Sequence, residues 1–267
     1  MAVHKISPEL LTLSQVDKIL KEGMTLELSQ ESKERIVKCR EYLDNKMKTQ
    51  KEPIYGVTTG FGSLCNISIS KEQLSQLQKN LVMSHACGVG EEVPAEIVKI
   101  MLLNKIQSLS YGNSGVQLQT VERLIAFFNN DILPVVYQQG SLGASGDLAP
   151  LAHMCLPLLG LGQVDYKGKR ISGEELNKEF NWQPIELQSK EGLALLNGTQ
   201  FMSSFAVWCV IKAQKLSDLA DKIMVVSLEG FDGRIEPFFD PVHQVRPHAG
   251  QIETARRVRE MLEGSQI

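Results

Sequence analysis

Apolar residues recur at three- and four-residue intervals along most of the chain, which is the spacing of one face of an α-helix. Similar patterns predict helices that end near Leu109, that follow Gly115, and that extend over Phe201–Leu228. The last of these is apolar almost throughout, which is typical of a helix buried inside a bundle. An earlier stripe among charged side chains is formed by Ile36, Cys39, Leu43 and Met47.

Alternation with a period of two, the pattern of β-strands, is rare in this sequence. The clearest case is residues 163–166 and 170–171, which flank a Lys167-Gly168 turn and predict a hairpin. We therefore expect a mainly α fold: a bundle of long helices with a smaller mixed α+β region at the N-terminus. The expected division is an N-terminal region of residues 1–110 and a helical bundle region of residues 111–267.

The composition fits a soluble globular protein, with 43% hydrophobic and 22% charged residues. A net charge of -3 gives no reason to expect a nucleic acid or an anionic membrane as a partner. No apolar run reaches the length of a membrane span, and the N-terminus lacks the apolar segment of a signal peptide. The five cysteines include no C-x-x-C pair, which argues against disulfides and zinc, so we expect no metal and a cytoplasmic location.

Residues 140–146 contain three glycines at intervals of three, with small residues on either side of Ser145. Such a segment can adopt positive φ values and bend tightly. It lacks the lysine of a phosphate-binding P-loop, and its spacing differs from the Gly-x-Gly-x-x-Gly of dinucleotide-binding folds. A hydrolase nucleophile elbow is also excluded, because Asp147 stands where that motif requires glycine.

The triplet Ala144-Ser145-Gly146 allows a reaction of the backbone itself. If the turn is compressed, the amide nitrogen of Gly146 can approach the carbonyl carbon of Ala144, because glycine has no Cβ to block the attack. Loss of water would close a five-membered ring, and loss of the Ser145 hydroxyl would leave an exocyclic methylidene. The product is an electrophile, which ordinary side chains do not provide. For an anonymous loop, a glycine turn at the start of a helix is the simpler interpretation.

The stretch Gly143–Ala152, which reads Gly-Ala-Ser-Gly-Asp-Leu-Ala-Pro-Leu-Ala, resembles the signature of the aromatic amino acid lyases. That family comprises histidine, phenylalanine and tyrosine ammonia-lyases and the related aminomutases. The resemblance implies that residues 144–146 cyclise autocatalytically to 4-methylideneimidazole-5-one, the prosthetic group of the family. Asp147, whose simple role would be the N-cap of a helix that begins at Leu148, is by this resemblance a carboxylate that assists the dehydrations.

Two further segments resemble signatures of the same family. The stretch Tyr55–Gly62, Tyr-Gly-Val-Thr-Thr-Gly-Phe-Gly, implies that Tyr55 takes the β-proton of the substrate and that Gly62 lies at the substrate site. A tyrosine can act as a base only if its pKa near 10 is lowered by its neighbours. The stretch Lys190–Gln200 implies that Asn197 lies beside the prosthetic group, where its amide can donate to an oxyanion or a substrate carboxylate. Without the resemblance, both segments would be read as ordinary turns.

Ser84 and His85 are the residues on which the expected substrate depends. A lone histidine is usually a structural residue whose tautomer is fixed by a hydrogen bond. The resemblance implies that His85 faces the substrate side chain, and the Ser-His pair is the one seen in histidine ammonia-lyases. We therefore expect elimination of ammonia from L-histidine to give urocanate. A tyrosine or phenylalanine ammonia-lyase, or an aminomutase, stays open because it would share every other motif.

The resemblance covers essentially the whole chain but only the N-terminal half of a family member. The later half of the family supplies residues that hold the carboxylate and amine of the substrate. It also completes the long-helix bundle through which family members form homotetramers. We therefore expect this chain to carry the precursor of the electrophile and the base without a complete substrate cradle. An inactive helical fragment or assembly module is the alternative outside the enzyme class.

Overall fold

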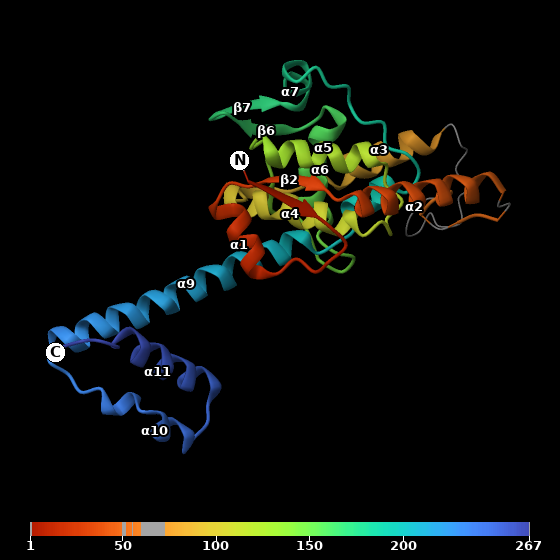
Figure 1. The fold of residues 1–267 in the computed structure, drawn as a ribbon. Coiled ribbons are helices and arrows are strands. Elements are labelled where there is room, and N and C mark those ends of the chain that lie inside the picture. Colours follow the sequence, from red (N-terminus) through yellow and green to blue (C-terminus); the bar gives the residue numbers. More distant parts are fainter. Residues whose placement is uncertain (1, 50–51, 55, 60–72, 267) are drawn as a thin grey trace. The chain divides into compact units, whose positions relative to one another are not determined.

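The computed structural model describes residues 2–49, 52–54, 56–59 and 73–266 (Figure 1). The chain divides into two compact units, Met1–Trp208 and Cys209–Ile267. Each unit is described by itself below.

The core of the first unit forms around α4 (Ala95–Ser110), which packs along α5 (Leu118–Asn129) (Figure 1). Almost every turn of α4 is apolar, so the helix is buried on most of its circumference rather than along one stripe. Its completely or almost completely buried side chains include Ile97, Ile100, Met101, Leu102, Leu103 and Ile106.

Three small sheets lie at the edges of this unit. Strands β1 (Val3–Ile6) and β2 (Thr25–Leu28) form a parallel pair. Strand β3 (Val89–Glu92) pairs antiparallel with β5 (Tyr137–Gln139). The third sheet has the order β4-β6-β7 and is antiparallel, with strands Leu133–Pro134, Gln163–Tyr166 and Lys169–Ser172. The β6-β7 pair is the hairpin that the sequence predicts around Lys167 and Gly168.

The other helices of the first unit are more amphipathic than α4, and all of them except α2 are shorter than α4. They are α1 (Leu13–Lys21), α2 (Gln30–Thr49), α3 (Leu74–His85), α6 (Leu148–Cys155), α7 (Gly173–Glu179) and α8 (Glu191–Leu196). A 3₁₀ turn, Leu156–Leu159, follows α6 directly. Helix α1 begins with a capping box in which Thr12 and Gln15 each bond the other's backbone amide.

Helix α9 (Gln200–Gly230) starts in the first unit and continues in the second. The second unit also contains a 3₁₀ turn (Glu236–Phe238), α10 (Asp240–Gln244) and α11 (Ala249–Met261). Within this unit, Arg257 of α11 forms an ion pair with Asp221 of α9 at 2.5 Å. Val258 of α11 is completely buried, and α11 packs against α10.

The predicted fold class is confirmed, because the described chain is mainly helical with a few short strands. The prediction that α9 is buried is wrong for most of its length: Leu216 and Ile223 are 65% and 57% exposed. In the second unit only one side of α9 is covered by described elements. The predicted boundary at residue 110 falls at the end of α4, within the first unit, and that division stays a prediction.

Within the described residues, the helical segment Glu191–Gly230 is apolar and long enough to cross a membrane by length and composition alone. Its most apolar window has a mean hydropathy of 1.3 and is 22% buried. The expectation from the sequence was different, because it counted only uninterrupted apolar runs. Core helices of soluble proteins pass the same test, so this segment assigns no location to the protein.

Candidate active site

The loop between β5 and α6 is tightly folded on itself. Gly143 and Gly146 both have positive φ values, +82° and +98°, which glycine adopts without strain. The amide of Gly146 approaches the carbonyl oxygen of Gly143 at 3.4 Å, and Ala144 pairs with Gly146 in a bridge that spans a single residue. Ser145, at the tip of this turn, is exposed. The triplet is therefore sharply bent, and Ser145 is open to solvent.

Gly146 is held by backbone from the third motif. A Cβ at Gly146 would lie 2.4 Å from the carbonyl oxygen of Gly198 and 2.7 Å from its nitrogen, so no larger residue fits without movement. The amide of Asp147 donates to the same Gly198 oxygen at 2.7 Å. The two segments, about fifty residues apart in the sequence, thus press directly against each other through their backbones.

Asn197 lies beside the triplet. Its Nδ2 atom donates to the carbonyl oxygen of Ser145 at 3.1 Å. Asn197 is the residue at which α8 ends, so the short helix sets the position of its side chain. The motif around Asn197 implies an oxyanion or a substrate carboxylate as the acceptor for this amide. In the structure the acceptor is the backbone carbonyl of the loop.

Asp147 is buried and its carboxylate does not cap the helix that follows it, in contrast to the simple expectation. Its Oδ2 instead accepts from the backbone amide of Met202 at 2.9 Å. Met202 lies in the first turn of α9, where backbone amides lack partners within the helix and favour a negative charge. Asp147 therefore ties the end of the triplet to α9, a contact across more than fifty residues that local spacing could not reveal.

Lys105 of α4 lies near Asp147 and α8, and it is only 1% exposed. Burial lowers its pKa to about 8, although the charges of Cys155 and Asp147 act in the opposite direction. Its Nζ atom donates to the carbonyl oxygen of Ala194 in α8 at 3.4 Å. A buried cation thus sits between the carboxylate that follows the triplet and the helix that carries Asn197. This residue was missed from the sequence, although its place four residues after Met101 on an apolar face is an unusual position for lysine.

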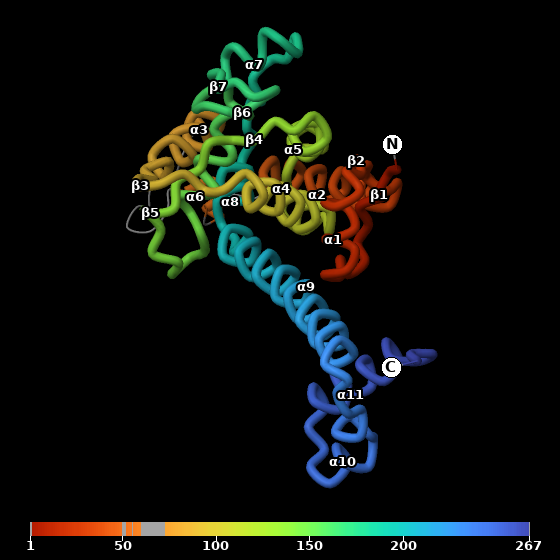
Figure 2. The backbone as a smooth tube through the Cα atoms, turned by 90° about the vertical axis from the view of Figure 1, so that its left-hand side faces the viewer, coloured from red at the N-terminus to blue at the C-terminus, as the bar shows by residue number. Residues whose placement is uncertain are grey.

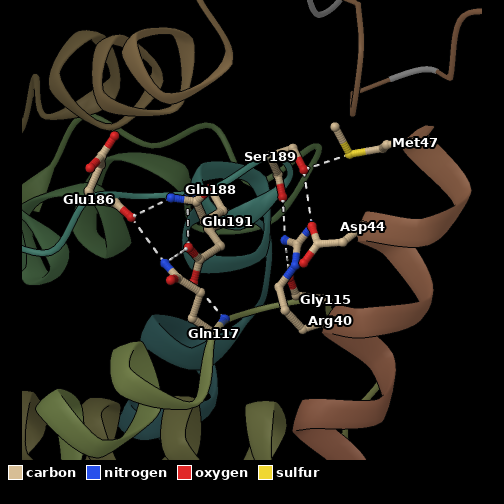
Figure 3. A network of polar contacts seen from close by, with 9 residues as sticks. All are labelled: Arg40, Asp44, Met47, Gly115, Gln117, Glu186, Gln188, Ser189 and Glu191. Atoms are coloured by element: carbon tan, nitrogen blue, oxygen red, sulfur yellow. Dashed lines mark hydrogen bonds and ion pairs between the residues drawn. The ribbon is translucent and has the colours of Figure 1, made fainter. Parts of the chain in front are cut away.

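Helix α8 is anchored by the buried carboxylate of Glu191, which is 0% exposed (Figure 3). Its oxygens accept from the amide and the side chain of Gln117 at 2.8 and 2.6 Å, and from the Thr120 hydroxyl at 2.7 Å. A fourth donor is the Gln188 amide at 2.7 Å. Because four donors surround it, this carboxylate is well solvated by protein groups despite its burial. It fixes the start of the helix that ends at Asn197.

A second buried group in the same network is Arg40 of α2 (Figure 3). Its guanidinium donates to the carbonyl oxygens of Gly115 and Ser189 at 2.7 and 2.9 Å and pairs with Asp44. Arg40 lies four residues after Ile36, on the apolar stripe, and that position was the available signal in the sequence. Together with Glu191, it holds the segment before α8 in place.

Ser84 and His85 lie at the end of α3, which packs against α6 and α8 (Figure 2). The Nδ1 atom of His85 is 2.8 Å from the carbonyl oxygen of Leu81, which is acceptor-only, so Nδ1 carries a proton and donates. The Ser84 hydroxyl lies 3.1 Å from both that oxygen and His85 Nδ1. Among the residues that the structure describes, no hydrogen-bond partner of Nε2 is found, so this edge of the ring can face a ligand.

The structure brings the triplet, Asp147 and Asn197 together through hydrogen bonds and backbone contacts, and places Ser84 and His85 on a helix packed against α6 and α8. Tyr55 and Gly62 lie outside the described residues, so their predicted roles stay predictions. Among the described residues, no group of three or more histidine, cysteine, aspartate or glutamate side chains could hold a metal ion.

A family model described as aromatic amino acid lyase matches residues 11–267. The chain belongs to the aromatic amino acid lyase family. The membership predicted from the three motifs is therefore confirmed. The match runs through both compact units.

Several aromatic amino acid lyases are similar along the whole chain. Histidine ammonia-lyase of Caldanaerobacter subterraneus subsp. tengcongensis is 47% identical over 96% of this chain and 50% of the relative. Histidine ammonia-lyase of Streptococcus gordonii is 44% identical over 98% of this chain and 51% of the relative. The chain spans about half the length of the curated relatives it matches.

Solved structures agree with this assignment. The histidine ammonia-lyase of Trypanosoma cruzi superimposes with a TM-score of 0.87 at 35% identity, covering 97% of this chain and 50% of that one. The phenylalanine aminomutase of Pantoea agglomerans gives a TM-score of 0.89 at 32% identity, covering 100% of this chain and 51% of that one. The fold is thus shared by an ammonia-lyase and an aminomutase, and fold similarity alone does not choose the substrate.

Proposed function

We propose that the protein eliminates ammonia from an aromatic-type amino acid, with L-histidine as the substrate and urocanate as the product. The reaction would depend on 4-methylideneimidazole-5-one formed from Ala144, Ser145 and Gly146. The observation that supports this most directly is the compressed triplet with the Asn197 amide 3.1 Å from the Ser145 oxygen. Once formed, the ring supplies an electrophilic carbon that can accept electrons during elimination.

The residues around the triplet fit such a group. Gly198 packs so closely on Gly146 that it favours the bent backbone, and the hydrogen bond from the Asp147 amide holds the two together. The Ser145 carbonyl is conjugated with the carbon that loses its hydroxyl, so negative charge would collect on this oxygen. Asn197 donates to that atom and would stabilise the charge where it develops.

Asp147 and Tyr55 complete the proposed chemistry of this chain. Asp147 is buried at the end of the triplet, from which position its carboxylate would assist the dehydrations. Tyr55 would remove the β-proton, and this role rests on the motif alone. His85 would read the substrate side chain through Nε2, because its Nδ1 atom is committed to Leu81.

A second enzymatic candidate is a tyrosine or phenylalanine ammonia-lyase or an aminomutase. It is favoured by the structural similarity to the Pantoea agglomerans phenylalanine aminomutase. The Ser84-His85 pair and the histidine ammonia-lyases among the relatives favour histidine instead. Outside the enzyme class, an inactive helical assembly module would keep the fold and lack turnover.

The first test is the intact mass of the chain, with fragmentation to locate any change. Loss of two waters within residues 144–146 is expected, with only weak urocanate formation when L-histidine is added. Ser145→Ala removes the hydroxyl that must leave, so this variant should lose at most one water, form no methylidene and show no turnover. Ser141→Ala, in the same loop, should behave like the unchanged chain. An unmodified mass would refute the proposed electrophile.

The products separate the remaining alternatives. Turnover of tyrosine or phenylalanine without turnover of histidine would transfer the proposal to the second candidate. A correctly dehydrated triplet without turnover of any of the three amino acids would favour the assembly module. A cytoplasmic homotetramer is part of the same proposal, and it is supported by the exposed apolar side chains of α9 such as Leu216, Leu219 and Ile223.

A further inference from the structure

His153 directly follows the first motif, Gly143–Ala152, and the proposed chemistry gives it no role. It lies in α6, the helix that starts directly after the triplet and Asp147. Its Nε2 atom is 2.9 Å from the backbone amide nitrogen of Gly88, which lies beyond the end of α3. The contact joins segments 65 residues apart in the sequence.

The donor in this contact fixes the state of the ring. A backbone amide can only donate, so Nε2 of His153 must be the unprotonated acceptor and the imidazole must be neutral. Burial lowers the pKa of His153, which favours the same neutral form. The ring also packs edge-on against Tyr137 of β5, with ring centroids 5.1 Å apart. Its orientation is thus determined from two sides.

Gly88 is confined by the same neighbours. A Cβ at Gly88 would lie 3.0 Å from Cδ2 and Nε2 of His153 and 3.1 Å from Cβ of Tyr137. A Cβ at Gly140, at the start of the triplet loop, would lie 3.0 Å from the Gly88 Cα. Directly after Gly88, Val89 pairs with Gln139 in the β3-β5 ladder. The backbone after α3 is therefore held against both ends of the β5-α6 connection.

This arrangement affects Ser84 and His85, which lie at the end of α3. Gly88 follows His85 by three residues, and the intervening chain is a tight turn in which the Cys87 amide donates to the His85 carbonyl oxygen at 2.9 Å. A displacement of Gly88 would therefore be transmitted to Ser84 and His85. Helix α6, on the other side of the contact, is continuous with the triplet.

We propose that His153 is a positioning residue whose neutral Nε2, by accepting from Gly88, sets the distance between the Ser84-His85 pair and the Ala144–Gly146 triplet. Its importance for substrate recognition rests on the proposed function. The structural part does not, because the contact between His153 and Gly88 can be measured without turnover.

The direct test uses the complete chain labelled with ¹⁵N-glycine and ¹⁵N-histidine, with amide exchange followed by NMR. His153→Leu removes the acceptor at similar bulk, whereas His153→Gln can place an amide oxygen near the position of Nε2. Exchange at Gly88 should become about threefold to tenfold faster in the leucine variant and stay within about twofold of the unchanged chain in the glutamine variant. Gly173, whose amide donates to Gly162 at 3.0 Å in another part of the unit, is the matched internal control.

Unchanged exchange at Gly88 in His153→Leu would overturn the proposal, as would equal acceleration at Gly88 and Gly173. If the leucine variant does not fold, the glutamine variant decides: protection at Gly88 supports the proposal and its loss contradicts it. The ¹⁵N shifts of His153 should also report an unprotonated Nε2. A protonated Nε2 would contradict the assigned contact.

Steady-state kinetics test the functional consequence. His153→Leu should raise KM for histidine about tenfold with kcat changed less than about threefold, and His153→Gln should restore KM. The triplet should lose two waters in both variants. Failure of dehydration would mean that His153 acts on the loop rather than on the turn after α3, and would overturn the proposal. Absence of turnover in the unchanged chain would count against the proposed function, while the exchange data would still decide the role of His153.

Discussion

Gly146→Ala tests whether close packing of backbone on backbone is what compresses the triplet. The matched control is Gly143→Ala, three residues earlier in the same loop. Both glycines have left-handed φ values, so alanine costs about 1–2 kcal/mol of conformational strain at either position. Only Gly146 is crowded: its Cβ would lie 2.4 Å from the Gly198 oxygen, whereas nothing lies within 4 Å of a Cβ at Gly143.

The structure gives the size of the difference. Cβ contacts shorter than 3.0 Å are essentially never observed, so Gly198 must retreat by about 0.6 Å from the added methyl group. That movement weakens the 2.7 Å hydrogen bond from the Asp147 amide to Gly198, which is worth about 1 kcal/mol. Steric repulsion that is not relieved adds about the same amount. The compressed state should therefore be disfavoured by about 2 kcal/mol more in Gly146→Ala than in the control.

A difference of this size corresponds to about 30-fold slower cyclisation. The assay is intact mass as a function of time after synthesis of the chain, with the loss of two waters located by fragmentation. Gly143→Ala should become dehydrated and Gly146→Ala should remain at the unmodified mass on the same timescale. Equal rates in the two variants would refute the reasoning, because the strain they share would then be the whole effect.

Four further predictions follow from the surrounding contacts. Asn197→Ala removes the donor to the Ser145 oxygen and should lower kcat about 100-fold to 1000-fold in steady-state kinetics. Because the side chain is exposed, the free energy of unfolding in urea should change by less than about 0.5 kcal/mol. Asp147→Ala should destabilise the chain in urea by about 1–3 kcal/mol, whereas Asp147→Asn retains an acceptor for Met202 and should lose less. The pKa of Lys105 falls from 10.5 to about 8 on folding, so the unfolded chain binds more protons than the folded chain between these pH values. The free energy of unfolding should therefore rise with pH over this range by about 3 kcal/mol. Lys105→Met should abolish that rise in urea titrations at several pH values. Glu191→Gln should cost about 3 kcal/mol in the same assay, because an amide cannot accept from all four donors, and a smaller loss than for an exposed glutamate would contradict the assigned network.

Much of the local structure could be predicted because its causes are local. The apolar periodicity of α4 and the Lys167-Gly168 turn of the hairpin produced elements close to those observed. Cap positions were less certain. Helix α1 is capped by Thr12 with Gln15, although Ser14 and Asp17, two residues later, have the same spacing.

The difference between local and long-range causes also holds for the candidate site. The sequence by itself determined the family, because the motifs that carry the resemblance are contiguous stretches of residues. It could not determine that Gly198 compresses Gly146, that the Asp147 carboxylate bonds α9 rather than α6, or that Lys105 is buried nearby. Those contacts join residues far apart in the chain, and their partners are chosen by the packing of whole helices, which no local pattern of residue types specifies.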